Sequence, residues 1–246
     1  MMNVETRSES VKTPDGTMPA HVARPKGASG KLAAVIVVQE AFGLNRNIQE
    51  IAERIASEGY HAMAPNFYYR EGGKAVGYGE LQEAIGLMGR WTDAQIVTDV
   101  RAAVAALESD GRVHADRIGI TGFCMGGRVS YLAACEIPAI RAAVAFYGGG
   151  IAGQQFTPGA AAPVSATAKM RAAILLHFGE KDSYIPLSAV EEIRQALERE
   201  KKDYEIHVYK GAGHGFFCRE RADYNEDAAK LAWERTKQFF KKHLQG

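Results

Sequence analysis

Gly119-Ile-Thr-Gly-Phe-Cys-Met-Gly-Gly127 is the stretch of this 246-residue sequence from which its fold can be worked out. A β-branched strand pattern ends at Gly122, and a helical pattern begins directly after Cys124. Glycines two residues on either side of the cysteine remove Cβ atoms that would collide with the neighbouring strand and helix. The G-x-Cys-x-G pattern therefore predicts a tight strand-to-helix turn that projects a cysteine above a sheet.

Cys124 is a candidate nucleophile in this turn. The N-terminus of the following helix directs backbone N–H groups and the positive end of its dipole at the cysteine, which favours a thiolate and a developing oxyanion. Two other interpretations stay open. The cysteine can be a buried structural residue of a glycine-rich turn, or the turn can bind phosphate, although the G-x-x-x-x-G-K-[ST] pattern of phosphate loops is absent.

Strand and helix patterns alternate on both sides of this turn. Two alternating stretches flank Pro14-Asp15-Gly16 and predict an N-terminal β-hairpin. Continuous β-branched runs predict buried strands of a parallel sheet, and apolar residues at helical spacing predict the helices between them. The fold class is therefore α/β, with a doubly wound, mostly parallel sheet flanked by helices in one domain over residues 1–246. The predicted strands are 5–11, 17–23, 32–39, 60–65, 117–121, 140–147, 172–178 and 204–209, and the predicted helices are 47–58, 92–107, 125–134, 188–201 and 225–243.

Two segments, 66–90 and 148–169, do not fit this alternation. The first is rich in glycine and tyrosine, and the second in Gly, Ala, Pro and Thr. Both follow the carboxyl ends of predicted strands, where ligands bind in open α/β sheets. They are either ligand-binding segments or simple connections.

The composition describes an ordinary globular chain, with 46% hydrophobic and 24% charged residues and a formal charge of +1. These values argue against disorder and against a general nucleic-acid binder, which needs a basic face. No apolar stretch approaches the roughly 18 residues of a membrane span, and the N-terminus lacks the apolar core of a signal peptide. We therefore expect a cytoplasmic protein that binds neither nucleic acid nor membrane, as a monomer or weak homodimer.

Cys124, Cys135 and Cys218 are the only cysteines, and their spacing fits neither a disulfide framework nor a zinc site. Cys135 lies about eleven residues further along the same predicted helix, which is too far for a disulfide with Cys124. No pair of histidines has the spacing of a metal-binding helix motif, so no metal is expected. Hydrolysis by a cysteine nucleophile requires no organic cofactor, and none is expected.

Asp182 and His214 are candidate partners of Cys124. Asp182 lies in a turn after the predicted strand 172–178, and His214 lies in a glycine-rich loop between the last strand and the last helix. Each alone has an ordinary explanation, as a turn or capping residue or as a loop hydrogen-bonding group. Together they follow the order nucleophile, acid, base that is typical of the α/β-hydrolase fold.

Glu40 follows the predicted strand 32–39, in a loop that supplies an oxyanion N–H group in α/β-hydrolases. A carboxylate near a thiol opposes thiolate formation, unless it accepts the thiol proton. Glu40 can equally be a surface or helix N-terminal acid, and the sequence leaves both possibilities open.

The chain resembles the dienelactone hydrolase family in motifs that follow one another along nearly its whole length. The resemblance implies an α/β-hydrolase that opens lactones or cleaves esters. The motifs are Gln39-Glu-Ala-Phe-Gly-Leu44, Ala64-Pro-Asn-Phe-Tyr68, Gly122-Phe-Cys-Met-Gly-Gly127, Phe146-Tyr-Gly-Gly-Gly150, Gly179-Glu-Lys-Asp182 and His214-Gly-Phe-Phe-Cys218.

The resemblance also implies a role for each site residue. Cys124 is the nucleophile, His214 its base and Asp182 the group that orients the base. Glu40 holds the resting thiol and accepts its proton when substrate binds. The remaining positions are the oxyanion N–H donors Ala41 and Met125, and the pocket-lining residues Phe42, Arg70, Trp91, Tyr147 and Arg221.

One departure from the family concerns the substrate. In its best-known members an arginine and a tyrosine precede the pocket tryptophan and bind the lactone's carboxylate, whereas here Ala84 and Met88 occupy about those places. The carboxylate clamp is therefore missing or is supplied by Arg70, Arg90 or Arg221.

The sequence predicts a hydrolase that cleaves a small lactone or carboxylic ester through an acyl-enzyme on a Cys–His–Asp triad. Two alternatives remain. One is a promiscuous carboxylesterase or thioesterase whose substrate is not dienelactone. The other is a hydrolase-fold binding protein without turnover.

Overall fold

In the computed structural model, which describes residues 2–153 and 161–246, eight strands form one sheet in the order β1-β2-β4-β3-β5-β6-β7-β8. The first two pairings of this order are antiparallel, and those from β4 to β8 are parallel. The strands are β1 (Val4–Thr13), β2 (Gly16–Pro25), β3 (Leu32–Val38), β4 (His61–Pro65), β5 (Val113–Phe123), β6 (Ile140–Phe146), β7 (Ala173–Gly179) and β8 (Tyr204–Tyr209).

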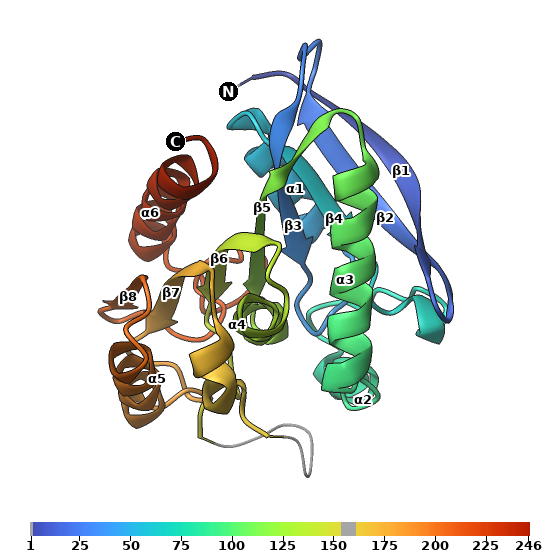
Figure 1. The fold of residues 1–246 in the computed structure, drawn as a ribbon. Coiled ribbons are helices and arrows are strands. Elements are labelled where there is room, and N and C mark those ends of the chain that lie inside the picture. Colours follow the sequence, from blue (N-terminus) through green and yellow to red (C-terminus); the bar gives the residue numbers. More distant parts are fainter. Residues whose placement is uncertain (1, 154–160) are drawn as a thin grey trace.

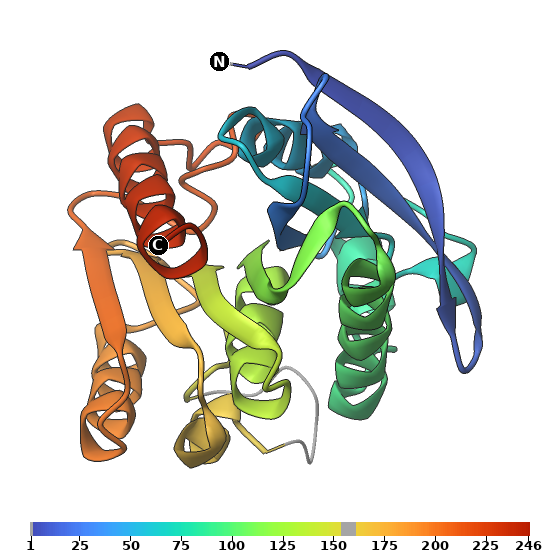
Figure 2. The ribbon, with the colours of Figure 1, turned by 45° about the horizontal axis from the view of Figure 1, so that its top comes forward.

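Helices cover both faces of this sheet. Helices α1 and α6 lie on one face, and α3, α4 and α5 lie on the other (Figures 1 and 2). The α-helices are α1 (Arg46–Ser57), α2 (Leu81–Met88), α3 (Asp93–Ser109), α4 (Met125–Glu136), α5 (Leu187–Arg199) and α6 (Glu226–Leu244), and the 3-10 helices are η1 (Tyr69–Glu71) and η2 (Pro163–Lys169).

The central strands are buried on both faces, as their apolar sequences predicted. Every residue of β4 and β7 is buried, and so is every residue of β3 after Leu32. The apolar stripes of the helices pack against these strands; in α1 the stripe includes Ile48, Ile51 and Ile55. The predicted α/β class, the mostly parallel sheet and the N-terminal hairpin are confirmed. None of the helices within the described ranges is long and apolar enough to cross a membrane.

The structure extends or fills in some predicted elements. Strand β5 begins at Val113 rather than at residue 117, because it also pairs ahead of the apolar run that the sequence shows. Segment 66–90 contains η1 and α2, neither of which was predicted. Segment 148–169 contains η2, while its residues 154–160 lie outside the described part of the chain.

Candidate active site

Cys124 lies between the end of β5 and the first residue of α4, with φ 55° and ψ −116°. A positive φ is uncommon for a residue with a side chain and marks a constrained turn. The turn depends on its glycines, since a Cβ on Gly122 would lie 2.1 Å from the Gly126 carbonyl oxygen. A Cβ on Gly126 would lie 2.6 Å from the carbonyl oxygens of both Val38 and Gln39. The steric reason given for the G-x-Cys-x-G pattern therefore holds in the structure.

Three residues predicted as a triad lie within hydrogen-bonding distance of one another. His214 Nε2 lies 3.2 Å from Cys124 Sγ, and His214 Nδ1 lies 2.8 Å from Asp182 Oδ2. His214 and Asp182 are buried, whereas Cys124 is partly exposed. A nucleophile that solvent can reach, a buried base and a buried orienting carboxylate form the arrangement of a covalent hydrolase.

Asp182 is held in place by the backbone of its own turn. Its Oδ1 accepts hydrogen bonds from the N–H groups of Tyr184 at 2.9 Å and Ile185 at 3.1 Å. The carboxylate therefore directs one oxygen at the backbone and the other at His214. This division fixes the orientation of the imidazole ring.

The electrostatics of the site favour a protonated His214. Burial acts to lower its pKa, but the negative charge at Cys124 and the hydrogen bonds to Asp182 and Cys124 outweigh burial and raise the pKa to about 10. His214 Nε2 therefore faces Cys124 Sγ in a position to hold the thiol proton.

Glu40 is fully buried, and its surroundings differ from the expectation. Its Oε2 accepts a hydrogen bond from the Tyr78 hydroxyl at 2.9 Å, and its Oε1 lies 3.5 Å from Arg221 Nη1. No hydrogen bond joins Glu40 to Cys124 within the described ranges; the thiol is bonded to His214 instead. Burial raises the pKa of Glu40, while Arg221 and the Tyr78 hydrogen bond act in the opposite direction.

Tyr78 is a site residue that the sequence analysis missed. Its hydroxyl accepts hydrogen bonds from the side-chain amides of Asn45 at 3.2 Å and Asn47 at 3.1 Å. With two donors directed at its oxygen, the hydroxyl is oriented to donate its own proton to Glu40. Its position in the tyrosine-rich segment 66–90 was the one hint in the sequence. That segment holds three tyrosines, and the sequence does not show which of them reaches the site.

A cavity of about 230 Å³ opens above Cys124. It contains both predicted oxyanion donors, and the Met125 N–H has no intrahelical acceptor because Met125 is the first residue of α4. Phe42 and Arg221 also line the cavity. The full set of lining residues is Ala41, Phe42, Leu81, Ile85, Met88, Gly89, Cys124, Met125, Gly149, Tyr184, His214 and Arg221.

Arg70 and Trp91 do not line this cavity, contrary to expectation. Arg70 donates hydrogen bonds to the carboxylates of Asp15 and Asp99, with contacts of 2.6 Å to each. The ring of Trp91 packs 5.0 Å from that of Tyr68, centroid to centroid, within an aromatic cluster. Both residues are therefore engaged in the structure of the fold.

Three further side chains do not line the cavity. Tyr147 is fully buried, with its ring centroid 5.2 Å from that of His214, so it packs against the imidazole ring. Cys218 is buried in the loop after His214. Arg90, which was a candidate for the carboxylate clamp, is exposed and ion-paired with Glu71.

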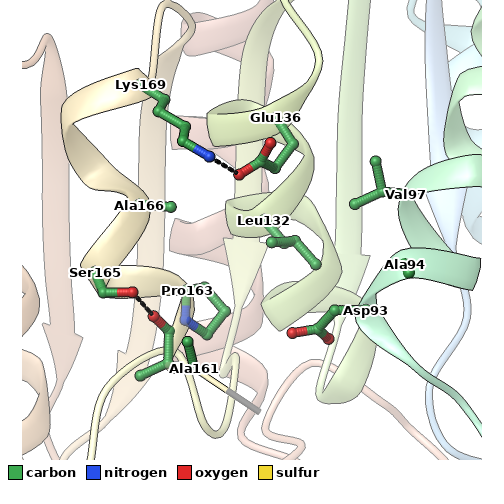
Figure 3. Close-up of a pocket in the computed structure, with 11 residues that line it drawn as sticks. Asp93, Ala94, Val97, Leu132, Glu136, Ala161, Pro163, Ser165, Ala166 and Lys169 are labelled. Carbon is green, nitrogen blue, oxygen red and sulfur yellow. Dashed lines mark hydrogen bonds and ion pairs between the residues drawn. The ribbon is translucent and has the colours of Figure 1, made fainter.

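A larger cavity of about 470 Å³ lies elsewhere, between α3, α4 and η2 (Figure 3). Its charged side chains are already paired: Lys169 contacts Glu136, and Asp93 forms two hydrogen bonds with Arg128. No residue of the predicted site lines it. We therefore place the candidate site at the smaller cavity, which is lined by Cys124 and His214.

Within residues 2–153 and 161–246, no three His, Cys, Asp or Glu side chains lie together so that they could hold a metal ion.

A doubly wound sheet with a cysteine at the strand-to-helix turn and a His–Asp pair at two later strand ends defines an α/β-hydrolase. Residues 18–244 match the model of the "Dienelactone hydrolase family". The chain belongs to the dienelactone hydrolase family. This membership confirms the resemblance seen in the sequence and identifies the protein as a hydrolase.

Individual relatives agree with the family. A Synechocystis protein named "Putative carboxymethylenebutenolidase" is 36% identical over 249 residues, which cover 99% of this chain and 100% of that protein. A Bradyrhizobium protein named "Probable 2-oxo-3-(5-oxofuran-2-ylidene)propanoate lactonase" is 36% identical over 228 residues, covering 92% and 90%. The crystal structure of a Klebsiella pneumoniae "Putative Dienelactone Hydrolase" is 36% identical, with a TM-score of 0.89 and coverage of 98% and 100%.

Proposed function

We propose that this protein hydrolyses a lactone or carboxylic ester through an acyl-enzyme on Cys124. The observation that carries the proposal is the continuous chain of contacts from Cys124 Sγ through His214 to Asp182, at 3.2 and 2.8 Å. The names of the relatives, a carboxymethylenebutenolidase and a lactonase, support the same bond type.

The first half-reaction forms the acyl-enzyme. The Cys124 thiolate attacks the carbonyl carbon, and the C=O electron pair moves to oxygen to give an oxyanion. The backbone N–H groups of Ala41 and Met125, which both line the cavity, donate hydrogen bonds to that oxyanion. When the C–O bond breaks, the imidazolium of His214 protonates the departing alkoxide, which stays attached to the acyl group when the substrate is a lactone.

The second half-reaction releases the acid. His214, now neutral, takes a proton from a water molecule as that water attacks the thioester carbonyl. The tetrahedral intermediate then collapses with breakage of the C–S bond. The carboxylic acid leaves, and the thiolate–imidazolium pair is restored.

Glu40 supports this cycle through its charge. The carboxylate of Glu40 and the ring of His214 attract each other electrostatically across the site. A negative Glu40 therefore favours the protonated His214 and, with it, the thiolate of Cys124. In this role Glu40 is not the direct acceptor of the thiol proton. Its negative charge stabilises the protonated form of His214, and His214 in turn activates the thiol.

The test is to replace the nucleophile and a second cysteine in parallel. Cys124→Ala should lower kcat/KM for p-nitrophenyl acetate at least about 10³-fold with an unchanged circular dichroism spectrum, because no other group in the cavity replaces the thiolate. Cys135→Ala, at a buried position of α4 outside the cavity, is the control and should keep the wild-type rate. A folded Cys124→Ala protein that retains activity would sink the assignment.

The second candidate is a carboxylesterase or thioesterase that does not act on dienelactone. It is favoured by the cavity lining, where the cation Arg221 is already paired with Glu40. Hydrolysis rates on dienelactone beside simple aryl esters and thioesters separate the two candidates.

The catalytic groups also bear on assembly and location. All three triad residues come from one chain, so we propose that a monomer is sufficient for turnover. A free thiol nucleophile is suited to a reducing compartment such as the cytoplasm.

A further inference from the structure

The mouth of the active-site cavity is lined by large apolar side chains that remain exposed. Leu81, Ile85 and Tyr184 are 41%, 44% and 55% exposed, and all three line the cavity. They are three of the seven large hydrophobic side chains exposed among the described residues. Exposed apolar side chains that gather at one place mark a binding surface, whereas single ones are ordinary.

Helix α2 is built to present such a surface. Leu81, Ile85 and Met88 follow a spacing of four and three residues, which places them on one side of the helix, and all three line the cavity. The opposite requirement, anchoring the helix to the protein, is met by the buried residues Ala84 and Leu87. Helix α2 therefore has three apolar residues that line the cavity and two that pack into the core.

The positive charges around this mouth are already neutralised. Among the lining residues, Arg221 lies 3.5 Å from the Glu40 carboxylate, and His214 is bonded to Asp182 and Cys124. On either side of α2, Lys74 is ion-paired with Glu83 and Arg90 with Glu71. A substrate carboxylate placed here would lose its water without gaining an unpaired cation, which is unfavourable.

The size of the cavity indicates where the substrate extends. At about 230 Å³ it lies below the 300–1,000 Å³ of typical ligand pockets, so it holds the ester group and a short part of the substrate. A longer chain can leave the cavity across the exposed faces of Leu81, Ile85 and Tyr184.

We propose that the substrate is an ester that carries an uncharged, apolar chain, and that this chain lies across α2 and Tyr184. The inference rests on the proposed ester-hydrolase function and adds the substrate class. The apolar surface at the mouth of the cavity selects against substrates with an ionised carboxylate at the far end of the chain.

The first experiment measures kcat/KM for two series of esters. One lengthens the acyl chain, from p-nitrophenyl acetate to p-nitrophenyl octanoate, and the other lengthens the alcohol, from methyl to hexyl acetate. Each methylene that leaves water should raise kcat/KM about threefold over part of at least one series. A flat or falling profile in both series would overturn the proposal, while Cys124-dependent hydrolysis of the acetates would leave the proposed function standing.

The charge preference is tested with a matched pair of substrates. p-Nitrophenyl hexanoate and mono-p-nitrophenyl adipate differ in that a terminal methyl group is replaced by a carboxylate. We expect the hexanoate to be preferred by at least about tenfold. Equal or faster hydrolysis of the adipate ester would show that a cation does become available and would contradict the proposal.

A variant pair assigns the effect to α2. Ile85→Asn should flatten the chain-length profile, whereas Leu231→Asn, at a similarly exposed position of α6 (46%), should leave it unchanged. Light scattering is measured on both variants. If Ile85→Asn changes the oligomeric state and not the chain-length profile, the apolar mouth is an interface between copies and the substrate proposal is wrong.

Discussion

At the scale of single residues, the geometry of the site is set by the hydrogen-bond and ion-pair partners of each polar side chain. Asp182 divides its two oxygens between backbone N–H groups and His214, so its position does not depend on the imidazole. Glu40 is likewise held by Tyr78 and Arg221. The sulfur of Cys124 is held by a hydrogen bond to His214, and this bond changes when a proton moves between the two groups.

Asp182→Asn tests the orienting role of the carboxylate. The asparagine oxygen can still accept the N–H groups of Tyr184 and Ile185, so the free energy of unfolding should change little. The charge that stabilises the imidazolium of His214 is lost, and we expect kcat for a p-nitrophenyl ester to fall by about 10²–10⁴. Steady-state kinetics and urea unfolding measure the two effects. A kcat within tenfold of wild type would argue that His214 is oriented by other groups.

Tyr78→Phe tests the charge of Glu40. Burial raises the pKa of Glu40 and the Tyr78 hydrogen bond lowers it, so removing the hydroxyl raises the pKa further. In the variant, Glu40 then becomes neutral at a higher pH than in the wild type. At pH values below that point it no longer stabilises the imidazolium of His214. The acid limb of the kcat/KM profile should move to higher pH, with larger losses at pH 5.5 than at pH 8.

The matched control for this prediction is Tyr69→Phe. The Tyr69 hydroxyl also donates to a carboxylate, that of Asp99 at 3.1 Å, but this carboxylate is paired with Arg70, whereas Glu40 interacts with His214. Its pH profile should match the wild type. An equal shift in both variants would mean that the acid limb reports general destabilisation.

At the scale of elements, the turn between β5 and α4 is the most demanding part of the fold. Gly126→Ala should destabilise the protein by about 1–3 kcal/mol or more, because its Cβ would lie 2.6 Å from two backbone carbonyl oxygens that cannot move independently. Gly111→Ala is the control, since a Cβ there meets nothing within 4 Å. Chemical denaturation measures both free energies of unfolding. Equal stability of the two variants would show that the turn can relax.

The long helices could be predicted from the sequence, whereas the short helices α2, η1 and η2 were missed. The five predicted helices lie within two residues of α1, α3, α4, α5 and α6. Helix α2 was missed because it has eight residues, two glycines near its end and a side that faces ligand space instead of the core. The spacing of Leu81, Ile85 and Met88 was a usable signal.

At the scale of the whole molecule, the sheet brings the triad together. Parallel strands β5, β7 and β8 end at one edge of the sheet, so residues separated by 58 and 32 positions meet there. Chain order and strand ends were enough to predict this meeting. The position of Arg70 could not be predicted, because its partners Asp15 and Asp99 come from a hairpin and a helix that are remote in sequence.

A buried histidine far from the site links stability to pH. His61 on β4 is fully buried, and neither ring nitrogen has a hydrogen-bond partner among the described residues. Burial is the main cause that lowers its pKa from 6.5 to about 4, while neighbouring acidic groups raise the pKa and neighbouring basic groups lower it by smaller amounts. The charged groups that act on it are Arg7, Glu9, Asp110 and Arg112.

The direction of the effect follows from which state binds the proton. Between pH 6.5 and 4 the unfolded chain protonates His61 and the folded protein does not, so stability falls as the pH falls through this window. A difference of this size corresponds to roughly 2–3 kcal/mol between pH 7 and pH 4.5. In His61→Leu the fall in unfolding free energy over this range should shrink by about that amount. The pH dependence of stability that remains in this variant includes a contribution from His177, which is also buried and has a lowered pKa. Urea unfolding at the two pH values measures the difference, and parallel losses in wild type and variant would place the acid sensitivity at other groups.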